Sequence, residues 1–185
     1  MKRLSHIIFT AFALASLIGQ AQAVDLDEVR FGVFAQSCCG FGSSKEDGAA
    51  INGEAVFSSP RFLSVLASPR PVVGATVATD GDATSQIYTG LEWRVEVSRF
   101  FVAAGVGAAI HNGETDRYDP IADAARVDDT IFFGCRALFR LAGDVGYRVT
   151  DRLSASFHWN HISNAGLCSD NEGLDQMGLR LGLSI

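Results

Sequence analysis

Apolar and polar residues alternate along much of the chain, and a period of two predicts β-strands because successive strand side chains point to opposite faces. In residues 153–163, for example, Phe157 and Trp159 alternate with His158 and Asn160. The alternation is strongest in four stretches: 87–97, 131–141, 153–163 and 175–185. Weaker alternation marks four more stretches: 29–36, 51–57, 71–79 and 100–111. Eight strands are therefore predicted in all.

Charged residues in the middle of these strands favour one all-β architecture over another. They share the polar face and are Glu92, Arg94, Arg136, Arg140 and Arg180. In a soluble β-sandwich they would face bulk water, whereas in a small membrane barrel they fill the interior while the apolar face meets lipid. The last two stretches cover eleven residues each, enough for a tilted strand to cross a bilayer. We therefore predict an eight-stranded antiparallel up-and-down outer-membrane β-barrel with an interior ion-pair network.

Loop lengths predict how this barrel is oriented. The longer connections would be 37–49, 80–86, 112–130 and 164–174, and the other connections 58–70, 98–99 and 151–152. Outer-membrane barrels carry their long loops outside and short turns on the periplasmic side. The turn at 58–70, which contains Pro60 and Pro69, is unusually long for an inner turn.

The first 23 residues resemble a secretory signal. Lys2 and Arg3 precede an apolar stretch over 7–18 and a small-residue cleavage site at 21–23. We therefore expect a signal peptide at 1–23 and one mature barrel domain at 24–185. After residue 23, no apolar run approaches the roughly 20 residues of a membrane-spanning helix, which excludes a helical inner-membrane protein.

Composition narrows the class of partners. The 185-residue chain has a net charge of −6 and only two lysines, with no run of basic residues. A nucleic-acid partner is therefore not expected. Four cysteines, Cys38, Cys39, Cys135 and Cys168, lie in the exported part, where disulfides form. Their pairing stays open, and with no histidine at zinc-like spacing we expect neither a metal nor a cofactor.

Three residues near the end of the chain match the needs of nucleophilic catalysis. His161 and Ser163 lie two apart and so leave the same, apolar face, and Asp175 has that parity on the following strand. In a hairpin, Asp175 would lie within cross-strand reach of the other two. A serine hydroxyl becomes a good nucleophile when an imidazole takes its proton and a carboxylate orients the imidazole. Asn164 and Asn171, in the intervening loop, are candidates to bind the oxyanion.

The same segment resembles the PagL-type lipid A 3-O-deacylase family. The similarity rests on the run from His161 to Gly166, then Asn171, Gly173, Asp175 and the closing 178–182. Asp175 stands fourteen residues after the histidine, where the family commonly has glutamate. The resemblance implies an outer-membrane enzyme that uses His161, Ser163 and Asp175, with Asn171 at the oxyanion.

The function predicted from this resemblance is hydrolysis of the ester-linked 3-hydroxyacyl chain at the 3 position of lipid A, within lipopolysaccharide of the outer leaflet. Two alternatives stay open. One is a non-enzymatic surface barrel for adhesion or membrane integrity, and the other is a lipid acyltransferase that uses the same site. Dimerisation is also left open by the sequence.

Overall fold

The chain folds into a closed barrel of eight strands joined in sequence order, with β8 pairing back to β1. The structure is a computed structural model and describes residues 24–38 and 40–185. All neighbouring strands are antiparallel, with these bounds: β1 (Leu26–Gln36), β2 (Ala49–Phe57), β3 (Arg70–Ala78), β4 (Gln86–Val97), β5 (Phe100–His111), β6 (Ala137–Arg148), β7 (Leu153–Ser163) and β8 (Leu174–Ser184). The predicted fold is therefore confirmed.

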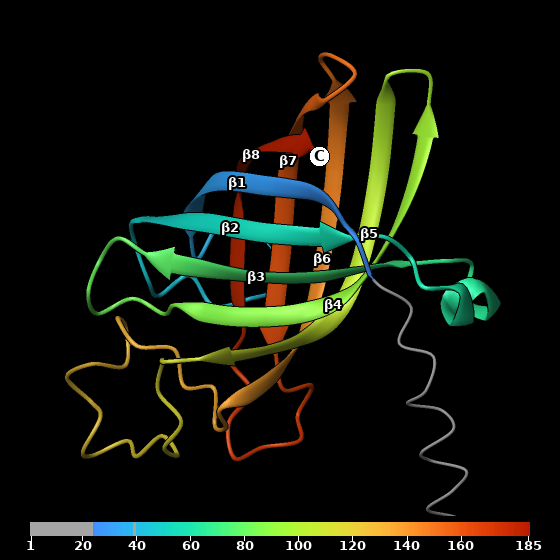
Figure 1. The fold of residues 1–185 in the computed structure, drawn as a ribbon. Helices are drawn as coiled ribbons and strands as arrows, with labels where there is room; N and C mark the ends of the chain where they lie inside the picture. The colour runs from blue at the N-terminus through green and yellow to red at the C-terminus, as the bar shows by residue number, and fades with distance from the viewer. Residues whose placement is uncertain (1–23, 39) are drawn as a thin grey trace, which may run out of the picture.

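Long loops gather at one end of the barrel and the turns lie at the other (Figure 1). We call these the loop end, with connections 37–48, 79–85, 112–136 and 164–173, and the turn end, with connections 58–69, 98–99 and 149–152. Connection 58–69 contains a short 3-10 helix, η1 (Arg61–Leu66). Within the described residues, no helix is long and apolar enough to cross a membrane. The expected signal peptide at 1–23 and Cys39 lie outside the described residues.

The two faces of the wall follow the alternation in the sequence. Phe31, Val95 and Leu179 are 66%, 68% and 71% exposed on the outside. Arg30 and Arg180, of opposite parity, are buried inside. The outer surface is thus an apolar belt, which a barrel in water would leave exposed and a bilayer covers.

Ion pairs fill the middle of the barrel, as predicted. Arg30 contacts Glu28 at 3.0 Å, Glu54 at 3.0 Å and Glu92 at 2.5 Å. Arg180 bonds to Glu54 at 3.1 Å on the other side. A cavity lined by Glu54, Glu92 and Arg180 measures about 10 Å³, room for roughly one water molecule. This part of the interior is packed and leaves no space for a channel.

The predicted strand 131–141 was wrong in its boundaries. β6 begins only at Ala137 and continues to Arg148. Ile131 and Phe133, expected on the lipid side, are 1% and 0% exposed and pack with Leu138 in a small apolar core near the loop end. Phe132 between them is also buried, at 2% exposed, so this apolar segment belongs to a loop packed at the barrel mouth, where burial also selects apolar residues.

Arg136 was wrongly assigned to the interior network for the same reason. It precedes β6, and its guanidinium donates to the carbonyl oxygens of His111 at 2.9 Å and Gly113 at 3.2 Å. Arg136 therefore ties loop 112–136 to the end of β5. Arg140, four residues further on, does lie inside, with its guanidinium stacked over the Tyr88 ring at 3.8 Å.

Candidate active site

The pairing of β7 with β8 brings together the three residues singled out in the sequence. His161 lies directly opposite Asp175 in the antiparallel register. The Asp175 Oδ1 atom is 2.8 Å from His161 Nδ1, and Ser163 Oγ is 2.9 Å from His161 Nε2. Ser163 lies on the same face of β7 because it follows His161 by two residues. The imidazole thus bridges the hydroxyl and the carboxylate on the outer wall, at the loop end.

The first loop, 37–48, holds Asp175 from the other side, which the sequence reading did not anticipate. The backbone N–H of Gly42 donates to Asp175 Oδ2 at 2.5 Å. The loop is fixed there by the backbone of Ser43, which donates to the carbonyl of Gly173 at 2.7 Å. The carboxylate therefore accepts hydrogen bonds from both the imidazole and the loop, which fixes its orientation and leaves it 1% exposed.

Glycines allow this close approach. A Cβ atom on Gly40 would collide with the Asp175 carboxylate, and one on Gly42 would lie 2.7 Å from the Gly173 carbonyl oxygen. A Cβ on Gly173 would in turn lie 2.6 Å from His161 Cε1. In the sequence, the only trace of this contact is the pair of glycines that flank Phe41. The sequence assigned these glycines no role because their partners lie more than 130 residues away.

Aromatic rings surround the imidazole. The Trp159 ring lies parallel to the His161 ring, with centroids 6.3 Å apart. Phe41 approaches both rings edge-on, at 6.4 Å from each. Phe41 is itself 88% exposed. The surface beside the imidazole of His161 is therefore apolar, and Phe41 leaves it open to the medium around the barrel.

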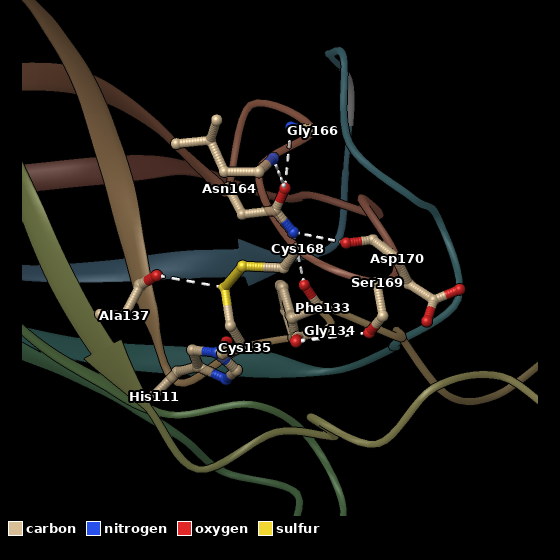
Figure 2. Close-up of a disulfide and its surroundings, with 11 residues drawn as sticks. His111, Phe133, Gly134, Cys135, Ala137, Asn164, Gly166, Cys168, Ser169 and Asp170 are labelled. Atoms are coloured by element: carbon tan, nitrogen blue, oxygen red, sulfur yellow. Dashed lines mark hydrogen bonds between the residues drawn. A yellow bond between two sulfur atoms is a disulfide. The ribbon is translucent and has the colours of Figure 1, made fainter.

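Asn164 was expected to offer either its side-chain or its backbone N–H to the oxyanion, and its side chain is already hydrogen-bonded within the loops. Figure 2 shows its amide nitrogen donating to the carbonyl oxygens of Phe133 at 2.6 Å and Asp170 at 2.5 Å. Its amide oxygen accepts from the backbone N–H of Gly166 at 2.8 Å. The side chain is thus committed to the loop, so an oxyanion role for Asn164 would use its backbone N–H. Asn171 is exposed in the same loop.

A disulfide joins loop 164–173 to the end of loop 112–136. It links Cys135 to Cys168, with Cα atoms 6.0 Å apart (Figure 2). The sequence left this pairing open, because four cysteines allow three pairings and the loop conformations decide among them. The disulfide and the Asn164 amide both tie the segment between Ser163 and Asp175 to the neighbouring loop.

Loop 112–136 is ordered by its own polar contacts. Glu114 accepts from the backbone N–H of Asp116 at 2.9 Å and from the guanidinium of Arg126 at 2.6 Å. These hydrogen bonds hold the pKa of Glu114 below its ordinary value. The carboxylate of Glu172 also accepts from the backbone N–H of Phe132 at 2.8 Å. The surface that holds loop 164–173 is therefore itself fixed in place.

Chemically, this arrangement can generate a nucleophile without a cofactor. A neutral imidazole that donates from Nδ1 to a carboxylate has an unprotonated Nε2, which can take the proton of a neighbouring hydroxyl. Trp159 and Phe41 would favour a substrate with a hydrocarbon portion near that imidazole.

Solved structures of similar shape support the fold. The crystal structure of the outer membrane enzyme PagL aligns with a TM-score of 0.59 and 17% identity, over 85% of this chain and 99% of that one. Neisserial surface protein A aligns with a TM-score of 0.54 and 9% identity, over 89% of this chain and 100% of that one. The N-terminal barrel of Pseudomonas aeruginosa OprF aligns with a TM-score of 0.52 and 9% identity, over 86% of this chain and 98% of that one.

Sequence comparison identifies the family. No curated protein of similar sequence matches the chain. The family model of PagL, lipid A 3-O-deacylase, matches residues 71–184, which include β3 to β8 and the three residues of the site. Because this match spans more than half of the chain, the chain belongs to the PagL family of lipid A 3-O-deacylases.

Proposed function

We propose that this chain is a serine esterase that removes the ester-linked 3-hydroxyacyl chain at the 3 position of lipid A. The observation that carries the proposal is the position of His161, which lies within hydrogen-bond distance of both Ser163 and Asp175 on the outer wall of the barrel. Family membership supplies the substrate class. Chemistry on the outer wall suits a substrate whose acyl chains are already dissolved in the membrane.

The barrel lies in the outer membrane, with the loop end outward. The apolar belt favours a bilayer around the wall, and the long loops favour an external loop end. His161, Ser163 and Asp175 lie at that end of β7 and β8. The site would therefore meet the outer leaflet, with the acyl chain beside Trp159 and the sugar head at the level of the loops.

The first step forms an acyl-enzyme. Ser163 Oγ attacks the ester carbonyl carbon while His161 Nε2 takes the hydroxyl proton, and Asp175 holds the imidazolium by its Nδ1–H. The negative charge that develops on the carbonyl oxygen would be stabilised by N–H groups of loop 164–173, with the Asn171 side chain and the Asn164 backbone as candidates. The carbon–oxygen bond to the sugar then breaks, and His161 returns the proton to the departing 3-hydroxyl.

The second step releases the fatty acid. His161 takes a proton from a water molecule, whose oxygen attacks the acyl carbon, and the proton then returns to Ser163 Oγ. An acyltransferase would differ only in this step, because another lipid hydroxyl would replace water. The composition of the products therefore separates the two reactions.

Mass spectrometry of lipid A from cells that express the chain or its Ser163→Ala variant tests the proposal. We expect loss of one 3-hydroxyacyl group with the intact serine and none with the variant, while both chains remain folded in the outer membrane. Equal loss with both would exclude the serine mechanism. Unchanged lipid A with both, together with no labelling of Ser163 by a fluorophosphonate probe, would favour the non-enzymatic barrel.

A further inference from the structure

The long connection between β2 and β3 is folded rather than loose. Helix η1 starts after Pro60 and ends at Leu66, where Ala67 adopts a left-handed conformation with φ of 62°. The backbone N–H of Ala67 donates to the Ser64 carbonyl oxygen at 3.1 Å, and Ser68 donates to that of Leu63 at 3.0 Å. These contacts close the last turn of the helix and give the connection a defined shape.

The helix directs most of its large apolar side chains away from the protein. Leu63 is 9% exposed, but Phe62, Val65 and Leu66 are 71%, 85% and 50% exposed. A 3-10 helix has three residues per turn, so Phe62 and Val65 lie one above the other on one face. Clustered exposed apolar side chains of this kind mark a surface that meets an apolar partner.

A hydrogen bond fixes η1 to the outside of the barrel wall. The indole N–H of Trp93, on β4, donates to the carbonyl oxygen of Leu66 at 2.7 Å. Trp93 shares the parity of Val95 and Val97, which are 68% and 72% exposed on the outer face. Figure 1 shows the green helical turn at the end of β2 and the start of β3, outside the outline of the wall.

Unequal strand lengths leave a step in the wall beside η1. β2 and β3 have nine residues each, whereas β4 and β5 have twelve each. Pairing between β3 and β4 ends at Arg70 and Glu92, so β4 continues from Trp93 to Val97 without β3 beside it. Helix η1 occupies the outside of this step and continues the apolar belt around it.

We propose that η1 is an interfacial anchor whose Phe62, Val65 and Leu66 enter the boundary between head groups and acyl chains of the phospholipids in the inner leaflet. Three observations favour lipid as the occupant: the continuity with the belt, the exposed face of the helix and the indole of Trp93 at the end of that belt. Tryptophan and amphipathic helices both concentrate at this boundary. A second copy of the chain is a poorer fit, because a stable dimer buries about 800 Å² on each partner and η1 is six residues long.

Quenching of an introduced tryptophan by brominated lipid tests this placement. The Val65→Trp variant is compared with the parent chain in vesicles of phosphatidylcholine with and without bromine on the acyl chains, so that the emission of Trp93 and Trp159 is subtracted. The matched control is Asp151→Trp, in the exposed turn 149–152 at the same end of the barrel. Phe62→Trp, an exchange of one aromatic ring for another, replaces Val65→Trp if that variant fails to fold.

We expect the added emission at position 65 to shift to shorter wavelength and to lose most of its intensity in brominated vesicles, while the emission at position 151 changes little. Equal, weak quenching at both positions would overturn the proposal. Weak quenching at position 65 combined with chemical cross-links between copies would overturn it in favour of a dimer contact. The readout does not involve hydrolysis, so it is independent of whether Ser163 is the nucleophile.

Discussion

At the scale of single residues, the geometry of the candidate site depends on glycines that have no side chain as well as on the side chains of His161 and Asp175. Asp175 is held by His161 on one side and by the backbone of Gly42 on the other. Gly40 leaves room for the carboxylate in the same loop. The precision of a triad depends on such support, because a displacement of the orienting group reduces the rate steeply.

Gly40→Ala is expected to reduce turnover strongly while the barrel still folds, because the new methyl group would displace the Asp175 carboxylate from the imidazole. Gly81→Ala is the matched control, since a Cβ atom at Gly81 has nothing within 4 Å. Both variants are compared by release of fatty acid from purified lipid A. Equal rates for the two would show that loop 37–48 does not set the position of Asp175.

Asp175→Asn keeps the size of the side chain but removes its charge and favours the wrong tautomer of His161. In a serine triad, this change lowers kcat on the order of 10⁴-fold. We expect a loss of similar size in the same release assay, with unchanged migration of the folded barrel on a gel. A rate close to that of the parent chain would place the carboxylate of the triad elsewhere, with Asp170 and Glu172 as the next candidates.

At the scale of elements, the alternation of apolar and polar residues predicted the strands better than the loops. Residues 153–163 form β7 with the predicted bounds, because a strand with one face in lipid and one inside must alternate. Ile131 and Phe133 have the same odd-numbered parity as the apolar residues of β6, yet they are buried with Phe132 in a loop at the barrel mouth. Burial by a loop and burial by lipid select the same residue types, so the pattern could not separate them.

Removing the Cys135–Cys168 disulfide tests whether the loops hold the site together. The bridge spans 33 residues, and a cross-link of this length contributes about 3 to 4 kcal/mol by the chain-entropy estimate. We expect the Cys135→Ala/Cys168→Ala variant to lose several-fold in turnover and to be cleaved faster by protease in loop 164–173, with the barrel intact.

Reductant provides the control for this prediction. Dithiothreitol should lower the turnover of the parent chain to that of the double variant and leave the double variant unchanged. A further loss in the double variant would point to Cys38 or Cys39 instead. Full activity of the reduced parent chain would show that the hydrogen bonds of Asn164 suffice to hold the loop.

At the scale of the whole molecule, ion pairs hold the inside of the barrel together and an apolar surface faces the bilayer outside. Arg180 is 2% exposed and bonds to Glu54 at 3.1 Å and to Asn52 at 3.0 Å. It also lies 3.5 Å from Asp144. Buried charges in such a network are tolerated because each one has several partners, and removing one leaves the others unpaired.

Arg180→Met is therefore expected to destabilise the barrel by about 3 to 5 kcal/mol, the usual result of leaving buried carboxylates without their partner. Arg152→Met, in an exposed turn, should change stability by less than about 0.5 kcal/mol. Unfolding by urea in detergent micelles measures both. A small effect of Arg180→Met would mean that Arg30 alone suffices to neutralise the charge of the buried Glu54 carboxylate.

The sequence by itself determined the wall of this protein and the chemical types at its site. Alternation gave the number of strands, the outward face and the shared face of His161, Ser163 and Asp175, because the period of a strand is a local property of the backbone, although it misplaced the start of β6. Only the tertiary structure decided the Cys135–Cys168 pairing, the contact of Gly42 with Asp175 and the use of Asn164 within its loop. These depend on segments up to about 130 residues apart, which lie side by side because the closed barrel brings its loops to one end.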